Sequence, residues 1–166
     1  MYVVTHQGEV SPKRQLDVLL VEDNDADIHL TLVAFRDAAT NNHVHVVKDG
    51  EEALAFLNRT GDHAKAPRPD IVLLDLNLPK LGGFEVLTQI KADPSLKRIP
   101  VIIMSGSDRA IDRIRGYDLQ VAGYLIKPPE VDRYFAAVRS VKEMWFHSLA
   151  LAPKDEDAAA GVKAVG

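Results

Sequence analysis

The sequence of 166 residues contains no cysteine, which excludes disulfides and thiolate chemistry and fits a reducing cytoplasm. No apolar run approaches the roughly 20 residues that a helix needs to cross a bilayer, and the first fifteen residues do not have the pattern of a secretory signal. The net charge is only −4, so there is no overall electrostatic attraction to nucleic acid or anionic lipid. We therefore expect a cytoplasmic protein that binds neither nucleic acids nor membranes.

Short apolar runs alternate with amphipathic segments along most of the chain. The predicted strands are 16–21, 43–47, 70–75, 99–105 and 122–126, and the predicted helices are 25–39, 50–58, 83–92, 108–116 and 131–151. Such alternation indicates right-handed crossovers and a parallel sheet with helices on both faces. The sequence therefore predicts one three-layer α/β domain at 16–152, preceded by a flexible arm at 1–15 and followed by a disordered tail at 153–166.

Polar side chains stand where four of the predicted strands end. The residues at these positions are Glu22 and Asp23, Asp75, Ser105, and Lys127. In an open parallel sheet, ligands bind beyond the carboxyl ends of the strands. We therefore expect these five side chains to converge on one crevice.

Three carboxylates in one crevice need a cation, because two of them about 4 Å apart repel by roughly 4 kcal/mol at an effective dielectric of about 20. A site of oxygen ligands suits Mg²⁺. A carboxylate held beside Mg²⁺, a lysine and a hydroxyl is placed to attack phosphorus, as in proteins that form aspartyl phosphates. The pattern therefore indicates phosphoryl transfer, with Asp75 as the candidate acceptor.

Four segments, LLVEDN, LLDLNLPKLGG, IIMSGS and GYLIKP, resemble in order and spacing the receiver domain of bacterial two-component response regulators. The resemblance covers about Leu16 to Leu149 and implies a doubly wound, flavodoxin-like sheet of strand order 2-1-3-4-5. It implies that Asp75 accepts a phosphoryl group from a histidine of a sensor kinase. It also implies that the protein is not an enzyme for other substrates and catalyses only its own phosphorylation and dephosphorylation.

The same resemblance implies a metal-ligand set. Asp23 and Asp75 would bind Mg²⁺ through their carboxylates and Asn77 through its backbone carbonyl. Glu22 would act mainly through water. The acidic pair here is Glu-Asp, where Asp-Asp is commoner in the family.

The resemblance also implies a phosphoryl-binding pair and a switch. Ser105, which replaces the commoner threonine, and Lys127 would contact the phosphoryl group. Tyr124 would turn inward when Ser105 moves toward the phosphate. The peptide bond between Lys127 and Pro128 is expected to be cis.

A narrower resemblance concerns RTGDHAKAPRPDIVLLDLNLPK, IKADPSLKRIPVI and MWFHSLALAP, which look like the stand-alone regulators paired with bacterial phytochromes. It implies a phytochrome kinase as phosphodonor and homodimers formed partly through the last helix. That helix is apolar beyond one stripe, so it has surface to bury. The predicted core stripe is Val131, Phe135, Val138, Val141 or Lys142, Trp145 and Leu149, while Tyr134, Met144 and Phe146 are predicted to point elsewhere.

Two other functions remain as alternatives. A phosphatase or phosphotransferase for small substrates also forms an aspartyl phosphate, but it usually needs an acid two positions on, where this sequence has Asn77. A receiver-like scaffold that is not phosphorylated usually loses the acidic pair or the lysine, and both are present here. We expect no second domain after Pro153, so the signal would pass to a downstream protein by partner binding, dimer exchange or phosphotransfer.

Overall fold

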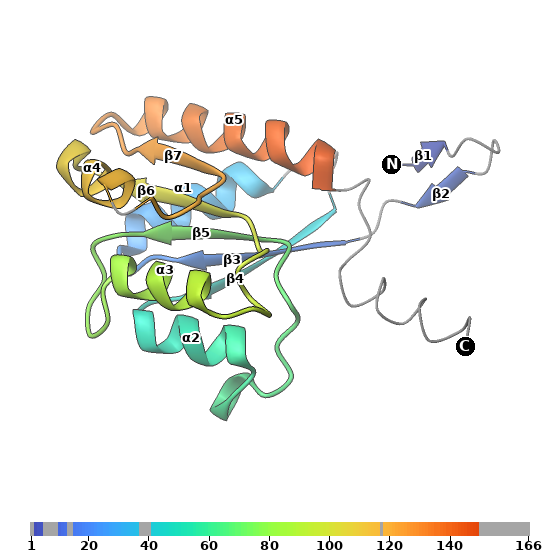
Figure 1. Cartoon of the computed structure of the whole chain (residues 1–166). Coiled ribbons are helices and arrows are strands. Elements are labelled where there is room, and N and C mark those ends of the chain that lie inside the picture. Colours follow the sequence, from blue (N-terminus) through green and yellow to red (C-terminus); the bar gives the residue numbers. More distant parts are fainter. Residues whose placement is uncertain (1, 5–9, 13–14, 37–40, 117, 150–166) are drawn as a thin grey trace.

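The computed structural model describes residues 2–4, 10–12, 15–36, 41–116 and 118–149. Its centre is a parallel sheet of five strands in the order β4-β3-β5-β6-β7 (Figure 1). The strands are β3 (Leu16–Val21), β4 (Asn42–Val47), β5 (Ile71–Asp75), β6 (Val101–Ser105) and β7 (Gly123–Ile126). Counted along the chain from β3, this order is 2-1-3-4-5, which confirms the predicted doubly wound α/β fold.

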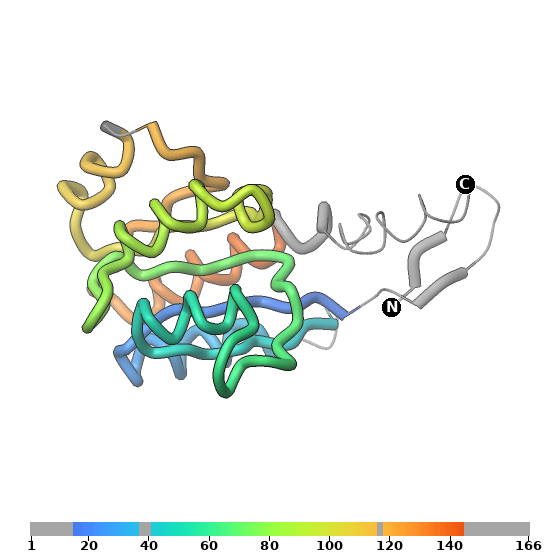
Figure 2. Tube along the Cα trace, turned by 60° about the horizontal axis from the view of Figure 1, so that its bottom comes forward, coloured from blue at the N-terminus to red at the C-terminus, as the bar shows by residue number. Residues whose placement is uncertain are grey.

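Among the described residues, five α-helices cover the two faces of this sheet. They are α1 (Asp25–Phe35), α2 (Gly50–Asn58), α3 (Gly83–Ala92), α4 (Asp108–Gly116) and α5 (Val131–Leu149), with a short 3-10 helix at Gly61–His63. Helices α1 and α5 pack against one face, and α2 and α3 lie side by side on the other (Figures 1 and 2). Helix α4 packs with α2 and α3, through Ile111 and Ile114.

The central strands are apolar throughout because both of their faces are buried. In β5, Val72 and Leu74 belong to the core under α2, α3 and α4, whereas Ile71 and Leu73 belong to the core under α1 and α5. Successive side chains of a strand point to opposite faces of the sheet, so neither face tolerates a polar residue until the strand ends.

Side chains and backbone geometry set the helix starts. The side chain of Asn24 accepts a hydrogen bond from the Asp27 N–H at the start of α1, and Asp49 does the same for α2. Gly82 occupies the N-cap position of α3 without a side-chain bond. Helix α1 ends at Phe35, whereas the sequence predicts 25–39; residues 37–40 lie outside the described part of the chain.

The buried face of α5 matches the predicted stripe in part, since Phe135 and Val141 pack half-buried against the core, but it differs at the start of the helix. Val138 is buried as expected, but Val131 is 59% exposed and Tyr134, predicted to point elsewhere, is 3% exposed. The Tyr134 hydroxyl lies 3.2 Å from Thr31 Oγ1 in α1, and this hydrogen bond allows the polar end of the ring to be buried. Lys142, which the predicted stripe includes as the alternative to Val141, is buried, and its Nζ donates to the Ala34 carbonyl at 3.3 Å.

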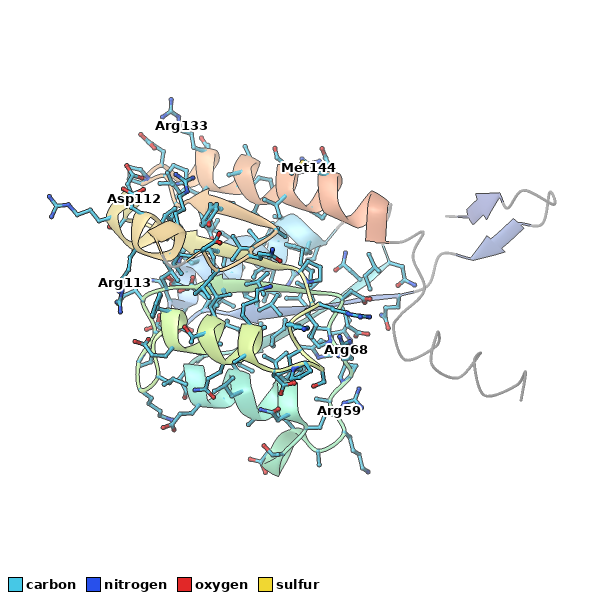
Figure 3. All side chains as sticks on the ribbon, viewed as in Figure 1. Arg59, Arg68, Asp112, Arg113, Arg133 and Met144 are labelled. Carbon is cyan, nitrogen blue, oxygen red and sulfur yellow. The ribbon has the colours of Figure 1, made fainter. Side chains whose placement is uncertain are left out.

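The ends of the helix and of the chain are only partly described. Met144 lies on the outer face of α5, as predicted (Figure 3). The side chains of Trp145, Phe146 and Leu149, and the predicted tail at 153–166, lie outside the described residues. Within the predicted arm, Tyr2–Val4 (β1) and Val10–Pro12 (β2) pair as antiparallel strands; the flexibility of the arm stays a prediction.

Two further findings concern backbone and helix character. The bond between Lys127 and Pro128 is trans, since the described residues contain no cis peptide, so the expectation of a cis bond is wrong for this structure. Within the part of the chain that the structure describes, every helix is too short or too polar to cross a lipid bilayer.

Candidate functional site

The carboxyl ends of β3 and β5 lie side by side at the topological switch point of the sheet. On one side of this point the chain adds β4, and on the other side it adds β6 and β7. After β3 the chain passes to α1 on one face, and after β5 it passes to α3 on the other. A crevice at such a point is the usual ligand site of doubly wound sheets. Because Val21 pairs in register with Leu74, the next residues, Glu22 and Asp75, come side by side at this edge.

The three predicted carboxylates gather there. Oxygens of Glu22, Asp23 and Asp75 all lie within 4.8 Å of one another. Asp23 is exposed, while Glu22 is fully buried and Asp75 is 6% exposed. They line a cavity of about 500 Å³. Oxygen donors of this kind fit a hard divalent cation better than a soft one, so the residues present suit the predicted metal.

Lys127 is shared by three carboxylates. Its Nζ donates to Glu22 Oε2, to Asp27 Oδ2 at 2.9 Å and to Asp75 Oδ2 at 3.0 Å, and its side chain is 13% exposed. A buried charge is tolerated when it is paired and hydrogen-bonded. This ammonium therefore allows Glu22 and Asp75 to lie together at the end of the most apolar strands.

Backbone N–H groups hold the remaining oxygens of the two buried carboxylates. The Asn77 N–H donates to Asp75 Oδ1 at 3.0 Å, and the Asn24 N–H donates to Glu22 Oε1 at 3.1 Å. Both bonds come from residues two positions further along the chain, in the turns that leave β5 and β3. The turns therefore fix the orientation of the carboxylates before any ligand binds.

Glu22 and Lys127 have shifted pKa values. Burial raises the pKa of Glu22 to about 7, and the hydrogen bond and charge of Asp75 act in the same direction, while Lys127 acts against them. Burial lowers the pKa of Lys127, but hydrogen bonds with Glu22 and Asp27 outweigh burial, so the net shift is upward. Lys127 therefore stays charged, while Glu22 exchanges a proton near neutral pH.

The other predicted site residues are Asn77, Ser105 and Tyr124, and not all of them line the cavity. Asn77 lines the cavity. Ser105 ends β6, the strand beside β5, and its Oγ accepts a hydrogen bond from the Ser107 N–H at 3.1 Å; Gly106, but not Ser105, is among the residues that line the cavity. Tyr124 lies in β7, packed against the core on the α4 side, with the Arg115 guanidinium 4.8 Å from its ring centroid.

Asp27 is a site residue that the sequence reasoning missed. It lies in the first turn of α1 and makes one of the three bonds to Lys127. A usable signal was present, because a helix that starts directly after a strand places the side chains of its first turn at the carboxyl edge of the sheet. The acidic run after β3, which continues through Asp25 and Asp27, marks this edge.

Comparisons with known proteins agree with this geometry. The sequence model of the family "Response regulator receiver domain" matches residues 18–139. Response regulator Rcp1 of Synechocystis sp. is 39% identical over 134 residues, which are 81% of this chain and 91% of that protein. The structure of the phosphorylated cyanobacterial phytochrome response regulator RcpA matches with a TM-score of 0.77 and 44% identity, over 81% of this chain and 96% of that one.

The structure of the Mn²⁺-bound form of Rcp1 matches with a TM-score of 0.75 and 39% identity, over 79% of this chain and 94% of that one. The residues that the family model matches, 18–139, include the acidic cavity, Lys127 and all of the sheet except the first two residues of β3. The two solved structures also agree with the fold of this chain. This chain therefore belongs to the family of response regulator receiver domains.

Proposed function

We propose that this protein is a single-domain response regulator that accepts a phosphoryl group on Asp75 from a histidine of a sensor kinase. The observation that carries the proposal is the placement of Asp75, 6% exposed, with one oxygen 3.0 Å from Lys127 Nζ and two further carboxylates beside it. A carboxylate in such a setting serves as a nucleophile toward phosphorus.

In the proposed reaction an Asp75 carboxylate oxygen forms a bond to phosphorus, the N–P bond of the donor phosphohistidine breaks, and the electron pair stays on the histidine nitrogen. Lys127, already beside Asp75, balances the charge of the transferring group. Ser105 would donate a hydrogen bond to a phosphoryl oxygen after leaving its contact with Ser107. Hydrolysis reverses the modification when water replaces Asp75 on phosphorus and frees the carboxylate and inorganic phosphate.

We assign Mg²⁺ as the physiological metal, held by Asp23, Asp75 and the Asn77 carbonyl, with Glu22 acting mainly through water. A bound divalent cation supplies positive charge beside the phosphoryl group. The oxygen-only donor set supports this assignment, and the Mn²⁺-bound structure of the relative Rcp1 supports a divalent metal in this fold.

The signal would leave the site through Ser105 and Tyr124 toward the face formed by α4, β7 and α5. Two large apolar side chains are exposed where β7 meets α5, Ile126 at 54% and Val131 at 59%. Met144 is 65% exposed further along α5 (Figure 3). Exposed apolar groups of this size favour burial against a partner, so we propose that this face and α5 bind a downstream protein or a second copy of the chain.

A bacterial phytochrome is the kinase that we propose as phosphodonor, in the cytoplasm. The support is the similarity of this chain to RcpA, a cyanobacterial phytochrome response regulator. The alternative function, a phosphatase or phosphotransferase for a small substrate, is less favoured. The residue two positions after Asp75 is Asn77, which cannot act as the general acid of such an enzyme.

Incubation of the protein with acetyl phosphate and Mg²⁺ is expected to add one phosphoryl group, because the carboxylate of Asp75 displaces acetate. Intact-mass spectrometry measures the gain. Asp75→Asn should abolish it, whereas Asp23→Asn should slow it without removing the acceptor atom. Phosphorylation of Asp75→Asn to the same extent, or steady turnover of small phosphoesters at enzyme-like rates, would contradict the proposal.

Mg²⁺ affinity is expected to depend on pH through Glu22. Since the pKa of Glu22 is raised to about 7, its carboxylate is charged at pH 8 and mostly protonated at pH 6. The protonated side chain lacks the negative charge that attracts the cation through water, so Mg²⁺ is expected to bind about tenfold more weakly at pH 6 than at pH 8. Titration followed by calorimetry at both pH values tests this, and Glu22→Gln should flatten the dependence; an unchanged slope in that variant would assign the titration to another group.

A further inference from the structure

Three basic side chains gather at the amino-terminal edge of the sheet, opposite the acidic site. Lys91 lies in the last turn of α3, and Lys97 and Arg98 lie in the segment that joins α3 to β6. These three residues, with 99–100 and 118–121, line a cavity of about 630 Å³, here called the basic pocket. Nothing in the proposed phosphoryl transfer uses this end of the molecule.

The positive charge of the basic pocket is not balanced by the described residues around it. Some exposed cations of the protein stand beside carboxylates, as Lys48 does beside Asp25 and Lys80 beside Asp49. In the described part of the chain, no such ion pair involves Lys91, Lys97 or Arg98. Asp118 is the one acidic residue in the lining, so three cations face a single carboxylate.

The surroundings of Lys91 indicate that the excess positive charge of the basic pocket favours an anionic ligand. Its Nζ donates to the Lys97 carbonyl oxygen at 3.3 Å, which holds the ammonium at the pocket. Burial lowers the pKa of Lys91, because the partly desolvated charge has no anion near it. A carboxylate that entered the pocket would relieve this cost and would also pair with the exposed charges of Lys97 and Arg98.

The chain itself provides a matching anion close to this edge. Helix α5 (Val131–Leu149) runs against the direction of the strands, so its C-terminal end lies at the edge where the strands begin (Figure 1). Residues 155–157 read Asp-Glu-Asp. Residues 155–157 lie six to eight positions beyond Leu149, which is about 20 to 27 Å of extended chain. Helix α5 and the α3 side of the pocket lie on opposite faces of the sheet, which is about 20 Å if each of the two layer spacings is about 10 Å. The acidic segment is therefore long enough to reach the pocket from the end of α5.

We propose that the acidic segment 155–157 of this chain docks in the basic pocket and pairs with Lys91, Lys97 and Arg98. Docking would hold the chain beyond α5 against the α3–β6 connection, at the end of the sheet remote from Asp75. The interaction is electrostatic and partly exposed, so salt weakens it. It does not depend on phosphorylation, and its failure would leave the proposed phosphoryl transfer untouched.

The lack of cysteine makes a direct test simple. A single cysteine introduced as Ala159→Cys in the full chain carries a nitroxide label, and amide NMR intensities are compared with the label oxidised and reduced. We expect selective loss of intensity at 97–98 and 118–121. The loss should vanish in Lys97→Gln/Arg98→Gln and in high salt, but persist in Arg109→Gln, which removes an exposed cation of α4.

A tail of the same length without charge separates docking from simple tethering. The labelled variant Asp155→Asn/Glu156→Gln/Asp157→Asn should show no selective loss at 97–98 and 118–121. Equal losses with the charged and the neutral tail would overturn the proposal. Inorganic phosphate added to the charged-tail and the neutral-tail protein gives a second test. Equal shifts of the NMR resonances of the pocket amides in both proteins would also overturn the proposal, because the free anion would then bind without competition from the tail.

Discussion

Lys127→Met is expected to lower the free energy of unfolding at pH 8 by about 3 kcal/mol, which is the order observed when one partner of a buried ion pair is removed. The change leaves Glu22 and Asp75 buried beside each other without the ammonium that now bonds to both. Methionine retains most of the volume of the side chain, so the loss reports on charge. Urea unfolding followed by circular dichroism measures it.

The loss is expected to shrink as the pH falls. Glu22 has a folded-state pKa raised to about 7, above its ordinary 4.5, so protonating it stabilises the folded state and this gain is lost as the pH rises through 7. Without Lys127 the pKa of Glu22 rises further, and the penalty is largest above pH 7. Mg²⁺ should restore stability to the variant by replacing the missing positive charge.

Lys80→Met is the matched control, because Lys80 also pairs with an aspartate, at 2.9 Å from Asp49, but its side chain is 60% exposed. Exposed pairs contribute little, so this variant should unfold like the wild type. If Lys127→Met lost the same stability at pH 5.5 as at pH 8, the lysine would act through packing of its aliphatic part and the electrostatic account would be wrong.

Gly83→Ala is expected to damage both the fold and phosphoryl acceptance. A Cβ at this first residue of α3 would lie 2.2 Å from the Asp75 carbonyl oxygen and 2.6 Å from the Leu76 Cα. Both are backbone atoms, so either the end of β5 or the start of α3 must move. Overpacking of this kind costs about 2 kcal/mol, and a shift of about 1 Å at a reacting group can reduce the rate roughly 100-fold.

Gly106→Ala tests whether this effect is specific. Gly106 lines the acidic cavity that Asp75 also lines, but an added Cβ there meets no atom within 4 Å. This variant should keep its stability and its rate of phosphorylation by acetyl phosphate. A wild-type rate in Gly83→Ala would show that the backbone at Asp75 adapts to the added methyl group, and that the close contact with α3 does not position the acceptor.

Much of the fold was predictable because the burial of strands and helices leaves a recognisable pattern of apolar residues in the sequence. Strands β5 and β6 are buried on both faces and so read as unbroken apolar runs. The first polar residue after each run marks the carboxyl edge of the sheet, which is why Glu22 and Asp75 could be placed in one site. The same logic predicted that Lys127 would join them.

Contacts between distant segments were not predictable in this way. The side chain of Lys127 bonds to Asp27, 100 positions away in sequence. The local sequence does not predict which acidic residue in the first turn of α1 points toward Lys127. The rotation of α5 was likewise ambiguous, since its sequence is apolar beyond one stripe. Its contacts with α1, such as Tyr134 with Thr31, decide which side is buried.

The sequence by itself determined the class of fold, the order of its elements and the chemical type of the site, because these depend on the spacing of apolar and charged residues along the chain. Only the tertiary structure decided that one ammonium is shared by three carboxylates, that the pKa of Glu22 is raised to about 7, and that Tyr134 rather than Val131 is buried. Desolvation and charge pairing depend on distances between atoms that only the packed layers bring together.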